Sequence, residues 1–207
     1  GESEKVGANL EGIAVAGNKL YVCNSCSSDY TTYYKNVVEL NASTLAKNQD
    51  IEVVDDPVDV INAGSAIFIL SMGNYADKPA TVQMLKDGQL STIGNATMMA
   101  YDAYNDQLYM INAPFGGDKE YKVYNLKNGQ TTTFLTNPDI FSPYSLAVNP
   151  VNGDVFITSS TKNPDTGYAD YTADCKLYRY TSAGILLGTY DCGVNPGTIV
   201  CDSYYQK

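Results

Sequence analysis

The sequence contains no histidine and no tryptophan, and only 17% of its 207 residues are charged. Without histidine, neither a Ser-His-Asp triad nor a Cys-His pair can be assembled from this chain. Lysine and arginine are also scarce, with 13 residues against 23 aspartates and glutamates, which gives a formal net charge of -10. Such a surface repels phosphate backbones and anionic lipid, so we expect no nucleic-acid partner and no binding to a membrane surface.

Long apolar runs are also missing. No stretch approaches the roughly 20 apolar residues of a membrane span, so we expect no membrane insertion. Tyrosine contributes 18 residues, and threonine, valine and asparagine are prominent, which is typical of an all-β protein. The first five residues carry no signal peptide and resemble a trimmed terminus, so we interpret the chain as a mature or truncated piece of a longer protein.

A five-residue strand signature occurs four times. Each copy reads aliphatic, aromatic, aliphatic, variable, then Asn or Ser, and the copies start at Leu20, Ile67, Leu108 and Val155. A short apolar strand precedes each copy and a hairpin follows it, in one case around Lys86-Asp87-Gly88. Four antiparallel strands in every 41 to 47 residues are typical of a propeller blade. We therefore predict an all-β fold, a β-propeller of four complete four-stranded blades plus one extra strand, within a larger ring of about seven blades.

The repeat also predicts where the blades lie within a single domain or fragment spanning residues 1–207. The predicted segments are blades at about 9–56, 57–95, 96–142 and 143–195, followed by a closing strand within 196–207. Propellers usually close by combining strands from both termini in one blade, because closure removes exposed edges. The simplest interpretation is that N-terminal blades are missing. The alternatives are a homodimer of two half-rings and a five-bladed ring with an incomplete last blade.

Two segments carry a family resemblance. Tyr21-Val22-Cys23-Asn24 resembles the YVTN-type propeller repeat, and Tyr109-Met110-Ile111-Asn112 echoes it. Asn195-Pro196-Gly197-Thr198-Ile199 resembles an ending in a propeller family of unknown function, common in surface lipoproteins of gut Bacteroidetes. The resemblance covers nearly the whole chain and implies an exported protein, periplasmic or exposed on the outer-membrane surface. That family is usually seven-bladed, and this chain is two to three blades shorter.

The loops that join second and third strands are the candidate binding region. They lie on the same face of a propeller as the loops between blades, and each contains an aromatic residue and an aspartate. Such residues offer apolar area and partners for sugar hydroxyls or peptide amides. The candidate ligand-binding residues are Asp29, Tyr33, Asn74, Tyr75, Asp77, Phe115, Asp118, Asp165, Tyr168 and Asp170. The competing interpretation is that these are ordinary loop-forming residues of an acidic β protein.

No metal site and no cofactor are predicted. Asn163, Asp165, Asp170 and Asp174 offer oxygen ligands for Ca²⁺, but their spacing differs from that of an EF-hand loop. Cys23-x-x-Cys26 has the spacing of half a zinc knuckle, and no second Cys pair follows it.

The disulfide pairing of the five cysteines stays open, and their odd number leaves at least one thiol free or paired between chains. Cys175 and Cys192, in the last two strands of the fourth blade, can be bridged if the register allows. Cys23 and Cys201 approach one another only if the ring closes within the chain. The favoured interpretation of Cys23 is a buried small hydrophobe.

The sequence favours a non-enzymatic binding or scaffolding propeller outside the cytoplasm. It would recognise a glycan, a peptide or a protein through its loop face, and no catalytic residue is predicted. The alternative is a lactonase- or hydrolase-like propeller enzyme whose essential residues lie in missing blades.

Overall fold

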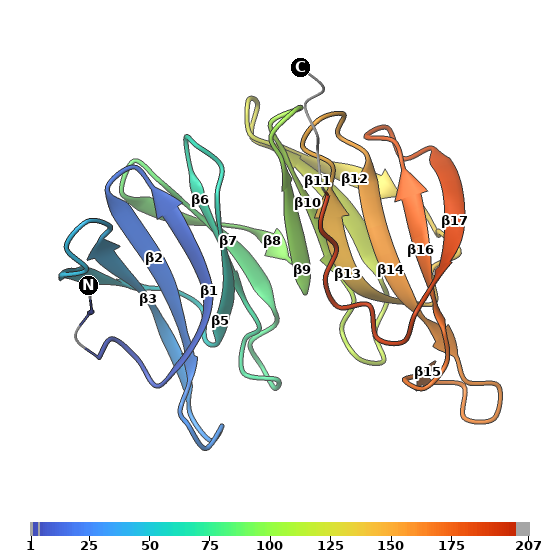
Figure 1. The fold of residues 1–207 in the computed structure, drawn as a ribbon, viewed down its shortest axis with the longest axis horizontal. Helices are drawn as coiled ribbons and strands as arrows, with labels where there is room; N and C mark the ends of the chain where they lie inside the picture. Colours follow the sequence, from blue (N-terminus) through green and yellow to red (C-terminus); the bar gives the residue numbers. More distant parts are fainter. Residues whose placement is uncertain (1, 4, 202–207) are drawn as a thin grey trace. The chain divides into compact units, whose positions relative to one another are not determined.

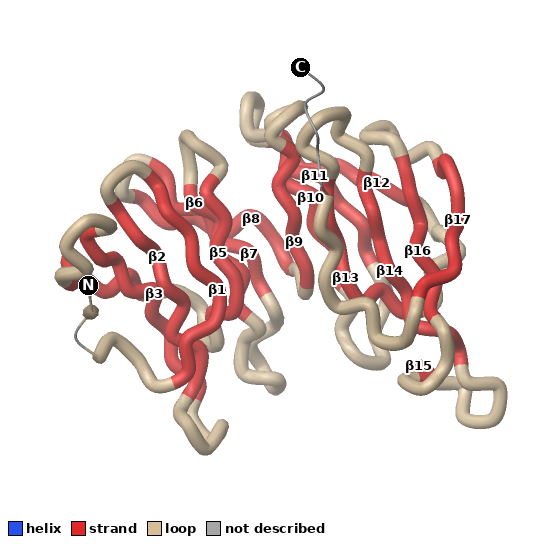
Figure 2. Tube along the Cα trace, in the orientation of Figure 1, coloured by secondary structure: helices blue, strands red, loops and turns tan. Residues whose placement is uncertain are grey.

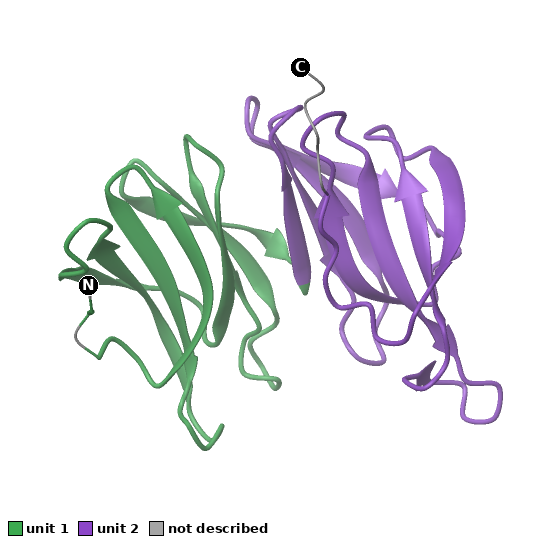
Figure 3. Cartoon of the chain, viewed as in Figure 1, with its two compact units in different colours: residues 1–97 green, residues 98–207 purple. Residues whose placement is uncertain are grey.

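The computed structural model describes residues 2, 3 and 5–201, which form β-strands, turns and loops (Figures 1 and 2). The chain divides into two compact units, which we call unit 1 (residues 1–97) and unit 2 (residues 98–207) (Figure 3). In the described part of the chain, no helix has the length and apolar character that crossing a bilayer requires.

Unit 1 consists of two antiparallel sheets of four strands each. In both sheets, strands that are consecutive in the sequence are neighbours. The first sheet comprises β1 (Asn9–Ala16), β2 (Lys19–Cys26), β3 (Tyr33–Asn41) and β4 (Lys47–Glu52). The second comprises β5 (Pro57–Asn62), β6 (Ile67–Ser71), β7 (Thr81–Lys86) and β8 (Gln89–Asn95).

Unit 2 repeats this topology with one addition. Its first sheet comprises β9 (Met98–Asp102), β10 (Gln107–Asn112), β11 (Glu120–Asn125) and β12 (Gln130–Leu135). The second comprises β13 (Ser142–Val148), β14 (Val155–Lys162), β16 (Cys175–Tyr180) and β17 (Leu186–Cys192). The short strand β15 (Ala169–Asp170) pairs with the end of β14. Ser142 therefore belongs to the fourth sheet rather than to the predicted third segment.

The repeated signature forms the second strand of each sheet, and burial explains its composition. All five residues of β6 are buried, and so are the last six residues of β2. The outermost strands β4, β8, β12 and β17 are mostly exposed. A strand covered on both faces favours a nearly continuous apolar run over strict alternation, and the signature has that composition.

Each unit has a core between its two sheets. In unit 1 it is formed by Tyr21, Cys23, Val37, Val53, Val60, Ile67 and Ile69. In unit 2 it is formed by Tyr109, Ile111, Tyr121, Leu135, Ile140, Val155, Ile157 and Tyr180. The aromatic residue of the signature thus points into the core in the first sheet of each unit.

The β7–β8 turn has the expected chemistry. Asp87 and Gly88 are its two central residues, with φ of 51° and 76°. A two-residue hairpin of type I′ needs positive φ at both positions, which aspartate tolerates and glycine adopts without steric cost. The Asp-Gly hairpin predicted from the sequence is confirmed.

The C-terminal segment differs from the prediction. Thr198–Cys201 forms no strand, and residues 202–207 of the predicted closing strand lie outside the described residues. Instead, Thr158 Oγ1 of β14 donates a hydrogen bond to the Pro196 carbonyl over 3.0 Å. A strand needs a neighbour for its backbone hydrogen bonds, and no described strand pairs with this segment. The additional strand in the described structure is β15.

Candidate functional site

The candidate residues lie at one end of the sheets in each unit. Strand direction alternates, so the loops after the second and fourth strands emerge at the same end. We call this end the loop edge, formed in unit 1 by residues 27–32, 53–56 and 72–80. In unit 2 it is formed by residues 113–119, 136–141 and 163–174.

At the loop edge of unit 1, two candidate tyrosines meet above a buried carboxylate. The rings of Tyr33 and Tyr75 have centroids 5.4 Å apart. The Tyr75 hydroxyl donates to Asp56 Oδ2 over 3.2 Å, and the buried Ser25 hydroxyl donates to Asp56 Oδ1 over 2.8 Å. Burial and the Asp56 carboxylate raise the pKa of Tyr75 to about 12. The hydrogen bond to Asp56 therefore holds the Tyr75 side chain in place, although 67% of the residue is exposed.

The other unit 1 candidates hold their own loops. Asp29 Oδ1 accepts hydrogen bonds from the hydroxyls of Ser27 and Thr31, at 2.6 and 2.8 Å, and both bonds lower the pKa of Asp29. The Asn74 amide donates to Asp77 Oδ1 over 2.7 Å and lowers the pKa of that carboxyl. These contacts are typical of turns that aspartate and asparagine stabilise. For these three residues the structure supports the loop-forming interpretation.

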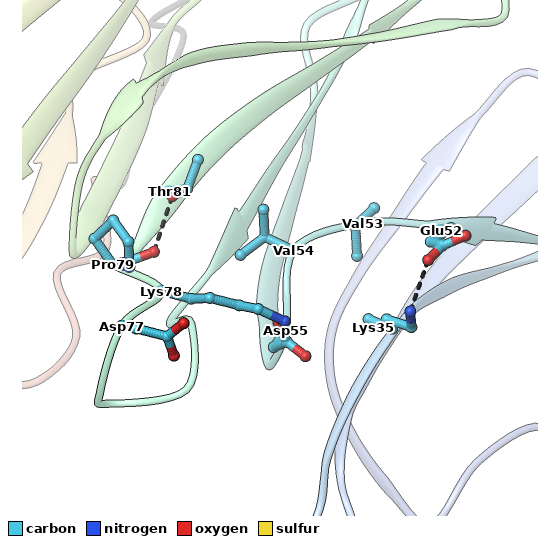
Figure 4. Close-up of a pocket in the computed structure, with 9 residues that line it drawn as sticks. All are labelled: Lys35, Glu52, Val53, Val54, Asp55, Asp77, Lys78, Pro79 and Thr81. Atoms are coloured by element: carbon cyan, nitrogen blue, oxygen red, sulfur yellow. Dashed lines mark hydrogen bonds and ion pairs between the residues drawn. The ribbon is translucent and has the colours of Figure 1, made fainter.

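A hollow of about 370 Å³ lies beside Asp77 in unit 1 (Figure 4). Two ion pairs line it: Lys35 Nζ lies 2.8 Å from Glu52 Oε1, and Lys78 is paired with Asp55. The hydrogen bond to Glu52 raises the pKa of Lys35. Both cations of the hollow are thus neutralised by carboxylates of the same unit.

At the loop edge of unit 2, two candidate aromatic residues meet in solvent. Phe115 is 95% exposed and Tyr168 is 66% exposed. Their rings come from the β10–β11 and β14–β15 loops and lie nearly parallel, with an interplanar angle of 14° and centroids 6.2 Å apart. The structure therefore brings together two predicted residues from two neighbouring sheets of this unit.

Two lysine ammonium groups lie over a third aromatic ring of unit 2. The ammonium groups of Lys119 and Lys162 lie 5.7 and 5.9 Å from the centroid of the Phe141 ring. These distances are within the range of cation–π attraction. Phe141 lies in the loop between the two sheets, and the lysines flank the loops that carry Phe115 and Tyr168.

The three acidic candidates of unit 2 differ in their contacts. Asp170 Oδ1 accepts from the Thr172 hydroxyl over 2.7 Å, which lowers the pKa of Asp170. The exposed carboxylates of Asp118 and Asp165 form no hydrogen bond or ion pair within the described residues. The Asn163 amide oxygen accepts from two backbone N–H groups of its own turn. Across the described part of the chain, no group of three or more Asp, Glu or Cys side chains lies close enough together to hold a metal ion.

The structure also places the five cysteines. Cys175 and Cys192 lie directly opposite one another in β16 and β17, so the register allows a bridge, and all five cysteines are present as thiols. Cys23 is fully buried, and burial raises the pKa of its thiol to about 12. A buried, protonated thiol behaves as a small hydrophobe and not as a nucleophile or metal ligand.

Sequence reasoning missed Asp56, Phe141, Lys119 and Lys162. Phe141 and Asp56 both lie in the short loops between consecutive sheets, directly before Ser142-Pro143 and Pro57. Those loops share the loop edge, so extending the search from the longer loops to them would have found both residues.

Comparison with solved structures identifies the fold. The β-propeller domain of the Trilobed protease from Pyrococcus furiosus matches with a TM-score of 0.60 and 11% identity, over 91% of this chain and 58% of that one. An auxiliary nutrient binding protein from Bacteroides thetaiotaomicron matches with a TM-score of 0.60 and 12% identity, over 93% and 44%. A gluconolactonase from Xanthomonas campestris matches with a TM-score of 0.57 and 20% identity, over 91% and 63%. The chain is an all-β protein with a β-propeller fold.

The chain spans between about two-fifths and two-thirds of the solved structures named above. No family model matches it, and no curated protein is similar to it. The resemblance to the YVTN-type repeat therefore stays a prediction. At these identities the likeness extends to the fold alone, and a propeller serves both binding proteins and enzymes.

Proposed function

We propose that this chain is a non-enzymatic binding or scaffolding propeller that recognises a glycan, a peptide or a protein through its loop edge. The observation that carries the proposal is the pair of exposed rings, Phe115 and Tyr168, that two separate loops bring together. Large aromatic side chains dominate the energetics of recognition surfaces because each buries a large area on contact. We place the protein outside the cytoplasm, in the periplasm or on the outer-membrane surface.

Binding to arrayed glycans, peptides and extracellular proteins tests the proposal. The wild type is compared with a Phe115→Ala, Tyr168→Ala double variant, which we expect to bind at least tenfold more weakly, equivalent to about 1.4 kcal/mol. Tyr104→Ala is the matched control, because Tyr104 is 65% exposed in the β9–β10 turn, at the opposite end of its sheet. Equal binding by the double variant and the control contradicts recognition through these rings.

Hydrolysis of lactones by the purified chain is the second measurement. The proposal expects none, and turnover that is lost on substitution of a loop-edge carboxylate overturns it in favour of the enzyme alternative.

A further inference from the structure

The loop edges of the two units leave different groups available to a ligand. In unit 1, Lys35 and Lys78 are ion-paired, Asp29 and Asp77 hold their own loops, and Asp56 holds Tyr75. These groups already have partners inside the protein. Recruiting them for a ligand would break contacts that order the loops.

In unit 2 fewer of the corresponding groups are engaged: Asp170 holds its own turn, and Lys119 and Lys162 lie over the Phe141 ring. Within residues 5–201, neither Lys119 nor Lys162 forms an ion pair, and the Asp118 and Asp165 carboxylates have no hydrogen-bond partner. All four side chains are exposed. Two donors and two acceptors are therefore available beside the Phe115 and Tyr168 rings, in the same loops or directly flanking them. We call Phe115, Asp118, Lys119, Phe141, Lys162, Asp165 and Tyr168 the unit 2 patch.

The exposed rings give the unit 2 patch an apolar component. Covering a phenylalanine side chain gains about 1.5–3 kcal/mol relative to leaving it in water, and Phe115 is 95% exposed. Single exposed apolar residues are ordinary, but here a second exposed ring lies parallel to the first. A ligand with a flat apolar face gains most from this arrangement.

The polar groups restrict the charge of the ligand. A carboxylate only accepts hydrogen bonds and an ammonium only donates them, so both are satisfied by hydroxyl groups, which do both. Asp118, Asp165 and the net charge of -10 repel an anionic ligand. The net charge attracts a cationic ligand, but Lys119 and Lys162 repel it at the patch itself. A purely apolar ligand makes no use of the four charged side chains and removes water from any that it covers, which costs free energy.

We propose that the unit 2 patch binds a neutral saccharide. A pyranose ring lies with its C–H face on Phe115 or Tyr168, and its hydroxyls donate to Asp118 and Asp165 and accept from Lys119 and Lys162. This inference rests on the proposed binding function and names its ligand class and its location.

Calorimetric titration with defined oligosaccharides tests the inference. The probes are neutral cello-, malto-, xylo-, manno- and galacto-oligosaccharides, trigalacturonate as an acidic sugar, and a glutamate-rich peptide as a non-sugar anion. We expect at least one neutral oligosaccharide to bind more tightly than trigalacturonate and the peptide. Phe115→Ala and Tyr168→Ala should each weaken that binding about tenfold, and Phe115→Tyr, which keeps the ring, by less than about threefold.

Polar variants and controls locate the site. Asp118→Asn and Asp165→Asn keep an acceptor oxygen but lose the charge, and each should weaken binding about three- to tenfold. Tyr104→Ala in unit 2 is the control and should bind as the wild type does. Tyr75→Ala tests the loop edge of unit 1, and the inference expects it to weaken binding less than Phe115→Ala does. All substituted side chains are exposed, and circular dichroism confirms that the variants are folded.

The outcomes separate this inference from the proposed function. Tighter binding of trigalacturonate, no binding of any neutral sugar, or loss of binding in Tyr75→Ala with Phe115→Ala unaffected each overturns the neutral-saccharide site. If a peptide or protein binds through the loop edge while the sugars do not, the proposed function stands and this inference falls. If no array probe binds through the loop edge, both fall.

Discussion

Unit 1 and unit 2 have the same strand topology but use the polar residues of their loops in different ways. In unit 1 the buried Asp56 joins Ser25 of β2 to Tyr75 of the β6–β7 loop, and two lysine–carboxylate pairs line the neighbouring hollow. Among the described residues of unit 2, the equivalent edge presents two lysines without an ion pair, Asp118 and Asp165 without a hydrogen-bond partner, and an exposed ring pair. The comparison shows that strand topology alone does not identify a binding edge. Polar loop residues can already be engaged in hydrogen bonds and ion pairs that order their own loop, and they are then not available to a ligand.

The cores of the two units differ as well, although the same repeat position contributes a tyrosine to each. In unit 1 a hollow of about 360 Å³, open to solvent and lined in part by Lys19 and Glu39, lies beside Tyr21. In unit 2 the ring of Phe134 packs edge-on against Tyr109, with centroids 4.7 Å apart. The Tyr109 hydroxyl also donates to the Ser182 carbonyl over 3.2 Å. The repeat therefore conserves the position of the aromatic ring and varies what surrounds it.

Core truncation should have the largest effect and tests whether the two cores are equally packed. Ile69 in unit 1 and Ile157 in unit 2 are both fully buried. We expect Ile69→Ala and Ile157→Ala each to lower the free energy of unfolding by about 2–5 kcal/mol, through lost burial and the cavity left behind. Urea denaturation measures both, with the exposed Thr131→Ala as control. A loss below about 1 kcal/mol for one variant and a loss of about 2–5 kcal/mol for the other contradicts equal packing.

Oxidation should separate the cysteines of the two units. Cys175 and Cys192 face one another across neighbouring strands, whereas Cys23 and Cys26 are three residues apart on one strand. With oxidised glutathione, the Cys175 and Cys192 thiols should lose two protons and two electrons, and two molecules of glutathione are released. We expect the disulfide to stabilise unit 2 by about 3 kcal/mol.

Alkylation of the remaining thiols followed by peptide mapping identifies the bond, and Cys175→Ser is the control that cannot form it. A bond from Cys192 to Cys201, or one between Cys23 and Cys26, would refute this assignment.

Removing the buried carboxylate of Asp56 should lower the stability of unit 1 and leave that of unit 2 unchanged. Asp56→Ala leaves the Ser25 and Tyr75 hydroxyls without their acceptor, and we expect a loss of about 1–3 kcal/mol. Asp56 has φ of 59°, which asparagine tolerates, so Asp56→Asn should cost less. Ser142→Ala tests the corresponding position before the proline of unit 2 and should change stability by less than about 0.5 kcal/mol. Thermal unfolding of the three variants measures the difference, and equal losses for Asp56→Ala and Ser142→Ala would remove the contrast between the units.

The smallest expected effect is on the pH dependence of stability. At alkaline pH, Tyr21 and Tyr109 should contribute differently to the free energy of unfolding. Burial raises the pKa of Tyr21 and of Tyr109 above the ordinary value of 10.0. In the folded state these two hydroxyls therefore stay protonated to a higher pH than in the unfolded state. Their contribution is complete below pH 10.0 and is lost as the pH rises through the folded-state pKa values.

Denaturation as a function of pH measures this effect in Tyr109→Phe and Tyr21→Phe. Tyr109→Phe should cost about 1 kcal/mol at neutral pH and should flatten the decline above pH 10.0 more than Tyr21→Phe does. An unchanged slope in both variants would show that these tyrosines do not govern the alkaline transition.

The sequence predicts the strands well where a residue's surroundings are set by the repeat itself. The signature at Ile67–Ser71 lies on a fully buried strand, and Asp87-Gly88 forms a hairpin for reasons local to two residues. The predicted strand at Thr198–Cys201 required a pairing partner from outside the segment, and no local pattern can reveal whether one exists. For this reason the repeat led to a correct fold, while the described part of the predicted closing segment, up to Cys201, forms no strand.

The candidate site was predictable to a smaller extent. Loop position and residue type selected Phe115 and Tyr168, whose rings lie side by side, and their role in binding stays a prediction. The use of Asp29 in its own turn could have been expected from Ser27 and Thr31, each two residues away. The role of Asp56 could not, because its partners come from strand β2 and from a loop in the next sheet.

The gradient of burial across each sheet has a consequence for how such chains diverge. Substitutions in β2 or β6 meet packed neighbours on both faces, whereas those in β4, β8 and the loops meet mainly solvent. A short buried segment in each repeat is therefore enough to preserve the architecture while most other positions drift. This accounts for solved propellers that share the fold with this chain at 11–20% identity. Under the proposed function, substitutions at the loop edge can therefore change ligand preference while the buried strands keep the fold.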